Sequence, residues 1–189
     1  YRTEYYYSNH FQWSRSFGRE LETRLEAKLE MPTEGCELGA SQSVITDKNN
    51  FDQNCKHVQS SGEVTVTGVY AKKDFRLGGL HLNHRVLLQW TSDYHVVPVP
   101  LASAFLAYYY EFNVVKNVLR MQIGIDCRYN TSYYAFSYQP ATSVFYNQRE
   151  MKVGEYPMMD AFVSAKWKRM RILLAIQHLN QDLIGDNNY

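Results

Sequence analysis

The chain has 189 residues, the size of one ordinary domain. Its 20 basic and 19 acidic residues give a net charge of +1 without a basic block, so nothing indicates a nucleic-acid partner. The sequence lacks a run of about 18 apolar residues, which excludes a transmembrane helix. Cys36, Cys55 and Cys127 are odd in number and match no disulfide framework, zinc site or redox motif.

Aromatic residues are unusually frequent. They make up 15% of the chain, and the 16 tyrosines include the runs 5–7 and 108–110. Tyrosine combines an apolar ring with a polar tip, so it suits strands, binding surfaces and membrane interfaces.

The first long patterned segment is 19–31. Its charged positions alternate with apolar or nearly apolar ones, and this period of two predicts a strand. A helix is the alternative, because Leu21, Leu25 and Leu29 recur every fourth residue among good helix formers. The charged positions are Glu20, Glu22, Arg24, Glu26, Lys28 and Glu30.

The rest of the chain favours strands. In 120–130, Met121, Ile123 and Ile125 alternate with Arg120, Gln122 and Asp126. In 63–70, Val64, Val66 and Tyr70 oppose Glu63, Thr65 and Thr67. Similar alternation marks 80–91, 103–113 and 160–168, and weaker strands fit Tyr5–Trp13, Glu37–Ile45 and Ile172–Leu179. The pattern predicts an all-β, antiparallel protein of about nine strands in a single domain, 1–189, without an internal boundary.

Short and long connections alternate along the chain. Four segments look tight: Pro32–Gly35, Lys72–Gly79, Val115–Val118 and Lys168–Arg171. Three other connections are longer and polar: Asp47–Ser60, Asp93–Pro100 and Gln139–Pro157. Everything after Asn180 is polar in the same way. Ser14–Gly18 takes the place of a long connection in this alternation but is short. Short turns at one end and long loops at the other are typical of a transmembrane β-barrel, whereas both ends of a soluble β-sandwich vary freely.

One face of the predicted sheet is too charged for a soluble core. In a barrel these side chains would line a water-filled pore, and the apolar face would meet lipid. The candidate pore-lining residues are Glu22, Arg24, Glu26, Lys28, Arg85, Glu111, Arg120, Asp126, Arg128 and Lys166. The candidate membrane-interface aromatics are Trp13, Trp90, Tyr108, Tyr110, Tyr129 and Trp167. The alternative for the charged residues is pairing across strands to stabilise the sheet.

The sequence offers little evidence for a catalytic or metal-binding site. His81 and His84 are three residues apart and would point to opposite faces of a strand, so they cannot share a metal. Asp93 and His95 could form an Asp–His pair, but no motif places a serine beside them. We therefore expect neither an enzyme nor a cofactor.

Several segments resemble a known family. They include 7–11 (YSNHF), 69–78 (VYAKKDFRLG), 111–119 (EFNVVKNVL), 126–135 (DCRYNTSYYA), 154–162 (GEYPMMDAF), 178–181 (HLNQ) and 187–189 (NNY). In this order they resemble the "putative porin" family of Bacteroidota outer membranes. The resemblance runs over most of the chain.

The resemblance implies a barrel in the outer membrane of a Gram-negative bacterium, acting as a channel for passive diffusion of small hydrophilic solutes, with the lipid bilayer as its other partner. Family members are longer and end in a further strand, so we expect this chain to be the C-terminal portion of a barrel without its closing strand. A non-conducting barrel and a soluble β-sandwich that binds carbohydrate are the alternatives.

Overall fold

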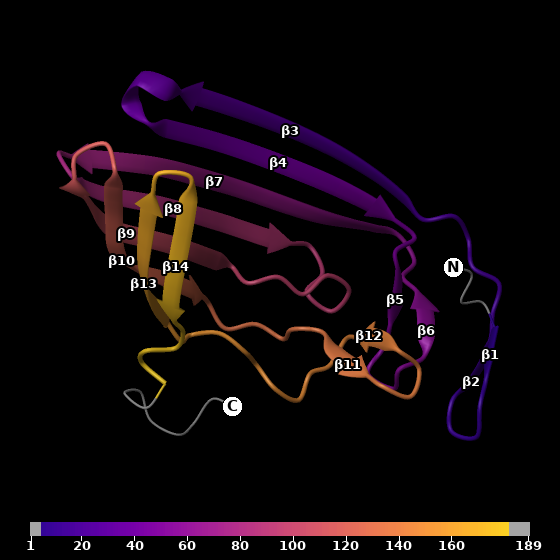
Figure 1. Ribbon diagram of the computed structural model, residues 1–189. Coiled ribbons are helices and arrows are strands. Elements are labelled where there is room, and N and C mark those ends of the chain that lie inside the picture. The colour runs from indigo at the N-terminus through magenta and orange to yellow at the C-terminus, as the bar shows by residue number, and fades with distance from the viewer. Residues whose placement is uncertain (1–4, 182–189) are drawn as a thin grey trace.

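A large antiparallel sheet dominates the computed structural model, which describes residues 5–181 (Figure 1). Each of its eight strands pairs with the next one along the chain, which gives the order β3-β4-β7-β8-β9-β10-β13-β14. The all-β prediction is therefore confirmed. The strands are β3 (Leu21–Met31), β4 (Cys36–Thr46), β7 (Glu63–Leu77), β8 (Leu80–Thr91), β9 (Ala102–Val115), β10 (Leu119–Asn130), β13 (Met158–Trp167) and β14 (Met170–Ile176).

The segment 21–31 is a strand, so the helical alternative is wrong. Every residue of β3 pairs with β4, from Leu21 opposite Thr46 to Met31 opposite Cys36. The alternation therefore outweighs the helix propensity of Leu, Glu and Lys, because a strand places all the charged residues on the face opposite the leucines, whereas a helix would spread them around its circumference.

The predicted strand Tyr5–Trp13 is wrong. The segment is a hairpin of two short strands, β1 (Tyr5–Tyr7) and β2 (Gln12–Ser14). Ser8 closes its turn, since the backbone N–H of Ser8 donates to the Phe11 carbonyl at 2.9 Å and the Phe11 N–H donates to Ser8 Oγ at 3.1 Å. The large sheet thus has eight strands in the described residues, rather than the predicted nine.

The four short connections lie at one end of the sheet, as their alternation predicts (Figure 1). The first contains a short 3-10 helix, η1 (Pro32–Glu34). Each has one residue with a left-handed backbone: Gly35, Gly78, Asn117 and Lys168, with φ between 51° and 62°. Tight hairpin turns favour this conformation because its twist matches that of the flanking strands.

One short connection lies later than expected. We predicted a turn over Lys72–Gly79, but β7 continues to Leu77 and only Gly78 and Gly79 connect it to β8. The charged run misled the prediction: Lys72, Asp74 and Arg76 share one face of the strand, so the alternation in fact continues through it.

The long connections gather at the opposite end of the sheet (Figure 1). Residues 47–62 form the hairpin of β5 (Asn49–Phe51) and β6 (His57–Gln59), and residues 131–157 form that of β11 (Ser137–Gln139) and β12 (Val144–Tyr146). The loops contact one another, since the Asn147 N–H donates to the Phe51 carbonyl at 2.9 Å. Residues 92–101 form the third long connection. The predicted one after Asn180 lies almost entirely outside the described residues.

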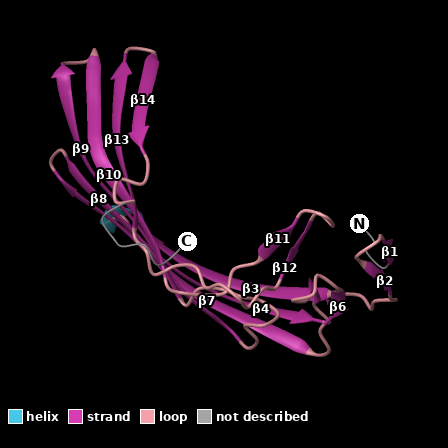
Figure 2. Cartoon of the chain, turned by 90° about the horizontal axis from the view of Figure 1, so that it is seen from below, coloured by secondary structure: helices cyan, strands magenta, loops and turns pink. Residues whose placement is uncertain are grey.

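The two faces of the sheet differ sharply. The pairing register places most of the leucines, isoleucines, valines and aromatics of the sheet on one face, which we call the apolar face, where Glu63, Lys73 and His84 are exceptions. The other, the polar face, carries most of the charged residues. The sheet is strongly curved, with β9, β10, β13 and β14 turned away from β3, β4 and β7 (Figure 2).

Burial is the reverse of that in a soluble protein. On the apolar face Leu25 is 74% exposed and Ile176 is 65% exposed, whereas on the polar face Val64 and Asp160 are 3% and 6% exposed. All the buried side chains of the sheet, Ile45, Val64, Thr91, Ala107 and Asp160, belong to the polar face. The polar face is therefore the inner side of the curve, although most of its charged side chains are themselves exposed.

The sheet is open. Its edge strands are β3 and β14, and within residues 5–181 no further strand pairs with the outer side of either. Among the eight strands of the large sheet, all but β14 have at least 10 residues. A tilted strand needs about 9–11 residues to cross a bilayer, so these strands are long enough. The described residues also contain no helix long and apolar enough to cross a membrane.

Candidate functional site: the polar face of the sheet

The ten candidate pore-lining residues share one face. The register places Glu22, Arg24, Glu26 and Lys28 of β3 on the polar face, together with Arg85, Glu111, Arg120, Asp126, Arg128 and Lys166 of the strands that follow. The structure thus brings residues from five strands onto one continuous polar surface.

Glu37 of β4 is the centre of the first ion-pair cluster. Its Oε1 accepts hydrogen bonds from Lys72 Nζ at 2.8 Å and from the Tyr70 hydroxyl at 2.9 Å. Lys28 Nζ lies 3.7 Å from the same oxygen and also pairs with Glu30. Two cations and a phenol thus converge on one carboxylate, which fixes the long side chains across three strands.

Glu111 of β9 forms the second cluster. Its carboxylate accepts hydrogen bonds from Arg120 and, at 2.7 Å, from the Gln122 amide. His81 Nε2 lies 3.8 Å from Glu111 Oε1, and the His81 ring stacks on Tyr109 with 4.6 Å between centroids. The glutamate side chain is only 14% exposed, so these partners replace water around it.

Asp160 of β13 forms the third cluster. Its Oδ2 accepts a hydrogen bond from Arg128 Nη1 at 2.7 Å, and its Oδ1 accepts one from the backbone N–H of His178 at 3.1 Å. Asp126 lies directly opposite Asp160 in the register. Two neighbouring carboxylates repel each other, and the positive charge of the Arg128 guanidinium offsets this repulsion.

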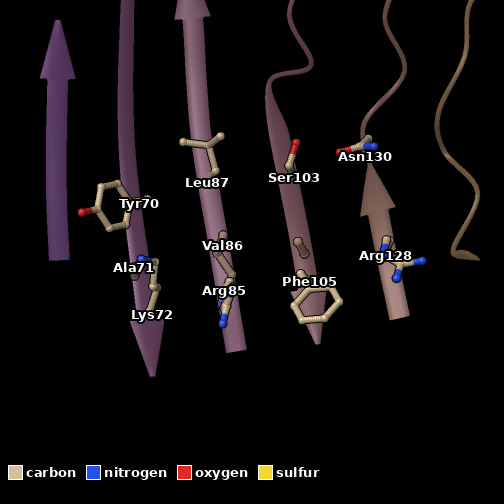
Figure 3. Close-up of a pocket in the computed structure, with 11 residues that line it drawn as sticks. Tyr70, Ala71, Lys72, Arg85, Val86, Leu87, Ser103, Phe105, Arg128 and Asn130 are labelled. Atoms are coloured by element: carbon tan, nitrogen blue, oxygen red, sulfur yellow. The ribbon is translucent and has the colours of Figure 1, made fainter. Parts of the chain in front are cut away.

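A hollow of about 440 Å³ lies between the first and third clusters, which contribute Tyr70, Lys72 and Arg128 to its lining (Figure 3). We call it the Arg85 hollow, and the polar-face residues that line it are Tyr70, Lys72, Arg85, Leu87, Ser103, Phe105, Arg128 and Asn130. Figure 3 shows the Phe105 ring between Arg85 and Arg128. The guanidinium carbons of these arginines lie 5.7 Å and 5.8 Å from the ring centroid, within the range of a cation–π contact.

The candidate pore-lining residues predicted from the sequence did not include Glu37, Asp160, Tyr70 and Phe105. Glu37 and Asp160 pair with cations on neighbouring strands, and the register that brings them together is not visible in a single strand. Phe105 and Tyr70 are aromatics on the polar face. The sequence signal that could have identified Phe105 is its spacing along the strand. Phe105 is two residues from Ser103 and six from Glu111, and residues separated by an even number of positions share one face of a strand.

In the first half of β7 the two faces are reversed. The register places Val64, Val66 and Tyr70 on the polar face, and Glu63, Thr65 and Thr67 on the apolar face. Val64 is buried, so the inner side of the curve includes buried apolar side chains near the long connections.

Five of the six candidate interface aromatics lie on the apolar face. Trp90 and Tyr129 are next to the long-connection ends of β8 and β10, whereas Tyr110 and Trp167 are near the short turns. Tyr108 lies midway along β9, where its hydroxyl is 2.8 Å from His84 Nε2.

Trp13 is the exception, because it lies off the sheet. It is 8% exposed and packs on Tyr6 and Phe51 in the loop hairpins, with ring centroids 4.6 Å and 5.8 Å away. The placement of Trp13 with the other interface aromatics depended on the strand Tyr5–Trp13, which does not exist.

The residues considered for catalysis or metal binding are not brought together. His81 is on the polar face and His84 on the apolar face. Asp93 Oδ1 accepts a hydrogen bond at 2.7 Å from the backbone N–H of His95, which is a local turn contact. Within residues 5–181 no group of three or more His, Cys, Asp or Glu side chains could hold a metal. The three cysteines are free thiols, and burial raises the pKa of the Cys55 thiol.

A comparison with protein families decides the relationship. The family model described as "Putative porin" matches residues 1–189, the whole chain. The chain belongs to this porin family. No curated protein and no solved structure matches it. Family membership agrees with the all-β fold, the long two-faced strands and the alternation of short and long connections.

Proposed function

We propose that this porin-family chain is part of a β-barrel in the outer membrane of a Gram-negative bacterium, where its polar face lines a path for passive diffusion of small hydrophilic solutes. The apolar face contacts lipid. No covalent step or cofactor takes part in such passage.

The inverted burial of the sheet carries this proposal. A soluble sandwich would pack its apolar face against a second sheet, yet here the leucines and isoleucines of that face are open and every buried side chain of the sheet belongs to the other face. An apolar surface of this extent is stable where it meets lipid. The apolar-face aromatics near both ends of the strands fit the two interfaces of a bilayer.

The charges suit a path without a strong preference for one sign. The ten candidate pore-lining residues comprise six cations and four carboxylates, and several are paired across strands. Fixed charges facing water select ions by their field, and paired charges present a weaker field than free ones. We therefore expect passage of neutral and singly charged solutes.

Liposome swelling tests this function. The purified full-length protein, reconstituted into liposomes, is expected to admit small sugars at rates that fall as sugar size increases, as diffusion through an aqueous path requires. Absence of swelling with arabinose and glucose, from a protein whose gel migration still shifts on boiling, would favour the non-conducting barrel. A protein that stays in buffer without detergent and shows no such shift would favour the soluble sandwich.

A further inference from the structure

We propose that the Arg85 hollow binds small organic monocarboxylates that carry an apolar ring, with Arg85 holding the carboxylate and Phe105 and Leu87 contacting the ring. This inference rests on the proposed function, because it assigns a preferred class of solute to the same polar face.

Arg85 is the cation of this hollow that lacks an anionic partner. Lys72 is 2.8 Å from Glu37 and Arg128 is 2.7 Å from Asp160, whereas no carboxylate oxygen of the described residues lies within 4.0 Å of the Arg85 guanidinium. Since Lys72 lies directly opposite Arg85 in the register, the two like charges repel each other. An anion bound at Arg85 would relieve this repulsion.

The hollow orients the guanidinium. The Arg85 side chain lies over the Phe105 ring, and Arg128 lies over the same ring with its position fixed by Asp160 (Figure 3). Stacking on an aromatic ring leaves the N–H groups at the edge of a guanidinium free, and these form the fork that matches a carboxylate.

The walls determine the class of anion. Leu87 and Phe105 provide apolar surface beside the charge, and Ser103 and Asn130 offer polar atoms at the rim without side-chain hydrogen bonds among the described residues. A volume of about 440 Å³ accommodates a single aromatic ring. Inorganic phosphate would lose hydration against the apolar wall, and acetate would leave that wall uncovered.

Calorimetric titration tests this inference. The purified full-length protein in mild detergent would be titrated with benzoate, acetate, inorganic phosphate or benzyl alcohol. We expect benzoate to bind at least about tenfold more tightly than the other three, because it alone supplies both charge and ring. Arg85→Gln should weaken benzoate binding at least about tenfold, the loss of a charge-assisted contact, and Arg85→Lys should weaken it less. Phe105→Ala should weaken it about as much as Arg85→Gln.

Arg76→Gln is the matched control. Arg76 is on the polar face, is exposed and has no ion-pair partner among the described residues, but it does not line the hollow. Unchanged affinity in Arg76→Gln supports the site. Equal losses in Arg76→Gln and Arg85→Gln, or equal affinity for benzoate and acetate, would overturn it, as would no benzoate binding. Gel migration that shifts on boiling establishes the fold of each variant.

The two proposals fail separately. Binding in detergent needs only the hollow, whereas liposome swelling needs an open path. A protein that swells liposomes but does not bind benzoate keeps its proposed function and loses this inference.

Discussion

Lys72 and Arg85 lie directly opposite each other on β7 and β8, and of the two only Lys72 has a carboxylate partner among residues 5–181. Like charges in opposed positions of an antiparallel pair destabilise the sheet unless other groups compensate for them. On this polar face three carboxylates, Glu37, Glu111 and Asp160, each accept hydrogen bonds from two donors. The stability of the sheet and the proposed contact with solutes therefore depend on the same side chains.

The Arg128–Asp160 pair should contribute more to stability than an exposed pair. Asp160 is 9% exposed at its side chain, so Arg128→Gln leaves a sheltered carboxylate without its charged partner. We expect the free energy of unfolding to fall by about 1–3 kcal/mol, measured by urea unfolding in detergent. Arg24→Gln is the control, since Arg24 and Glu26 are at least half exposed and 3.5 Å apart, and its effect should stay below about 1 kcal/mol. Equal effects would contradict this assignment.

Gly39 provides the space in which the Tyr70 ring lies. The two residues are directly opposed on β4 and β7, and a Cβ at position 39 would lie 2.3 Å from a carbon of that ring. Gly39→Val should displace Tyr70, break its hydrogen bond to Glu37 and lower the unfolding temperature by roughly 5 °C. At Gly68, also on the polar face, a Cβ would meet Ser41 Oγ at 3.4 Å, so Gly68→Ala should be tolerated. If Gly39→Val is equally stable, the ring does not depend on this glycine.

A strained turn offers a stabilising change. Lys168 connects β13 to β14 with φ of 51°, a conformation that costs a side-chain-bearing residue roughly 1 kcal/mol. Lys168→Gly should therefore raise the unfolding temperature, and Lys168→Ala, which removes the same charge but keeps the Cβ, should not. A similar shift in both variants would indicate that charge, rather than backbone strain, is responsible.

Acid should loosen the start of the connection between β4 and β7. Burial raises the pKa of the Glu20 carboxyl. Three effects outweigh burial and hold this pKa below the ordinary 4.5: a hydrogen bond from Lys48 Nζ at 2.7 Å, one from the Asn49 N–H at 2.9 Å, and the positive charge of Lys48. Because the folded pKa is depressed, the stabilisation is complete above the ordinary pKa and is lost as pH falls through the folded one. Hydrogen exchange at Asn49, corrected for its intrinsic pH dependence, should show lower protection as the pH falls below 4.5.

Glu20→Gln is the test of that cause. The variant should lose protection at Asn49 near neutral pH and show little further change on acidification. If the wild-type protein and the variant respond alike to acid, another group controls this loop.

The sequence predicted the parts of the fold that depend on a repeating pattern. Alternation placed β10 and the charged side of β3 correctly, because each strand is amphipathic along its whole length. It failed for Tyr5–Trp13, where the Ser8 turn interrupts an aromatic run, and for the end of β7, where charge was mistaken for a turn. The partners Glu37 and Asp160 could not be foreseen, because ion pairs across strands depend on register and on which strands are neighbours.

Single-cysteine labelling along β10 tests most directly whether the two faces of this sheet meet different surroundings. In a variant whose three native cysteines are changed to alanine, cysteines at Gln122 and Asp126 of the polar face and at Ile123 and Ile125 of the apolar face would be introduced one at a time. In the membrane-embedded protein we expect a charged water-soluble thiol reagent to label positions 122 and 126, and fluorophores at 123 and 125 to be quenched by lipid-soluble quenchers. Aqueous labelling of all four positions without lipid quenching would contradict the account.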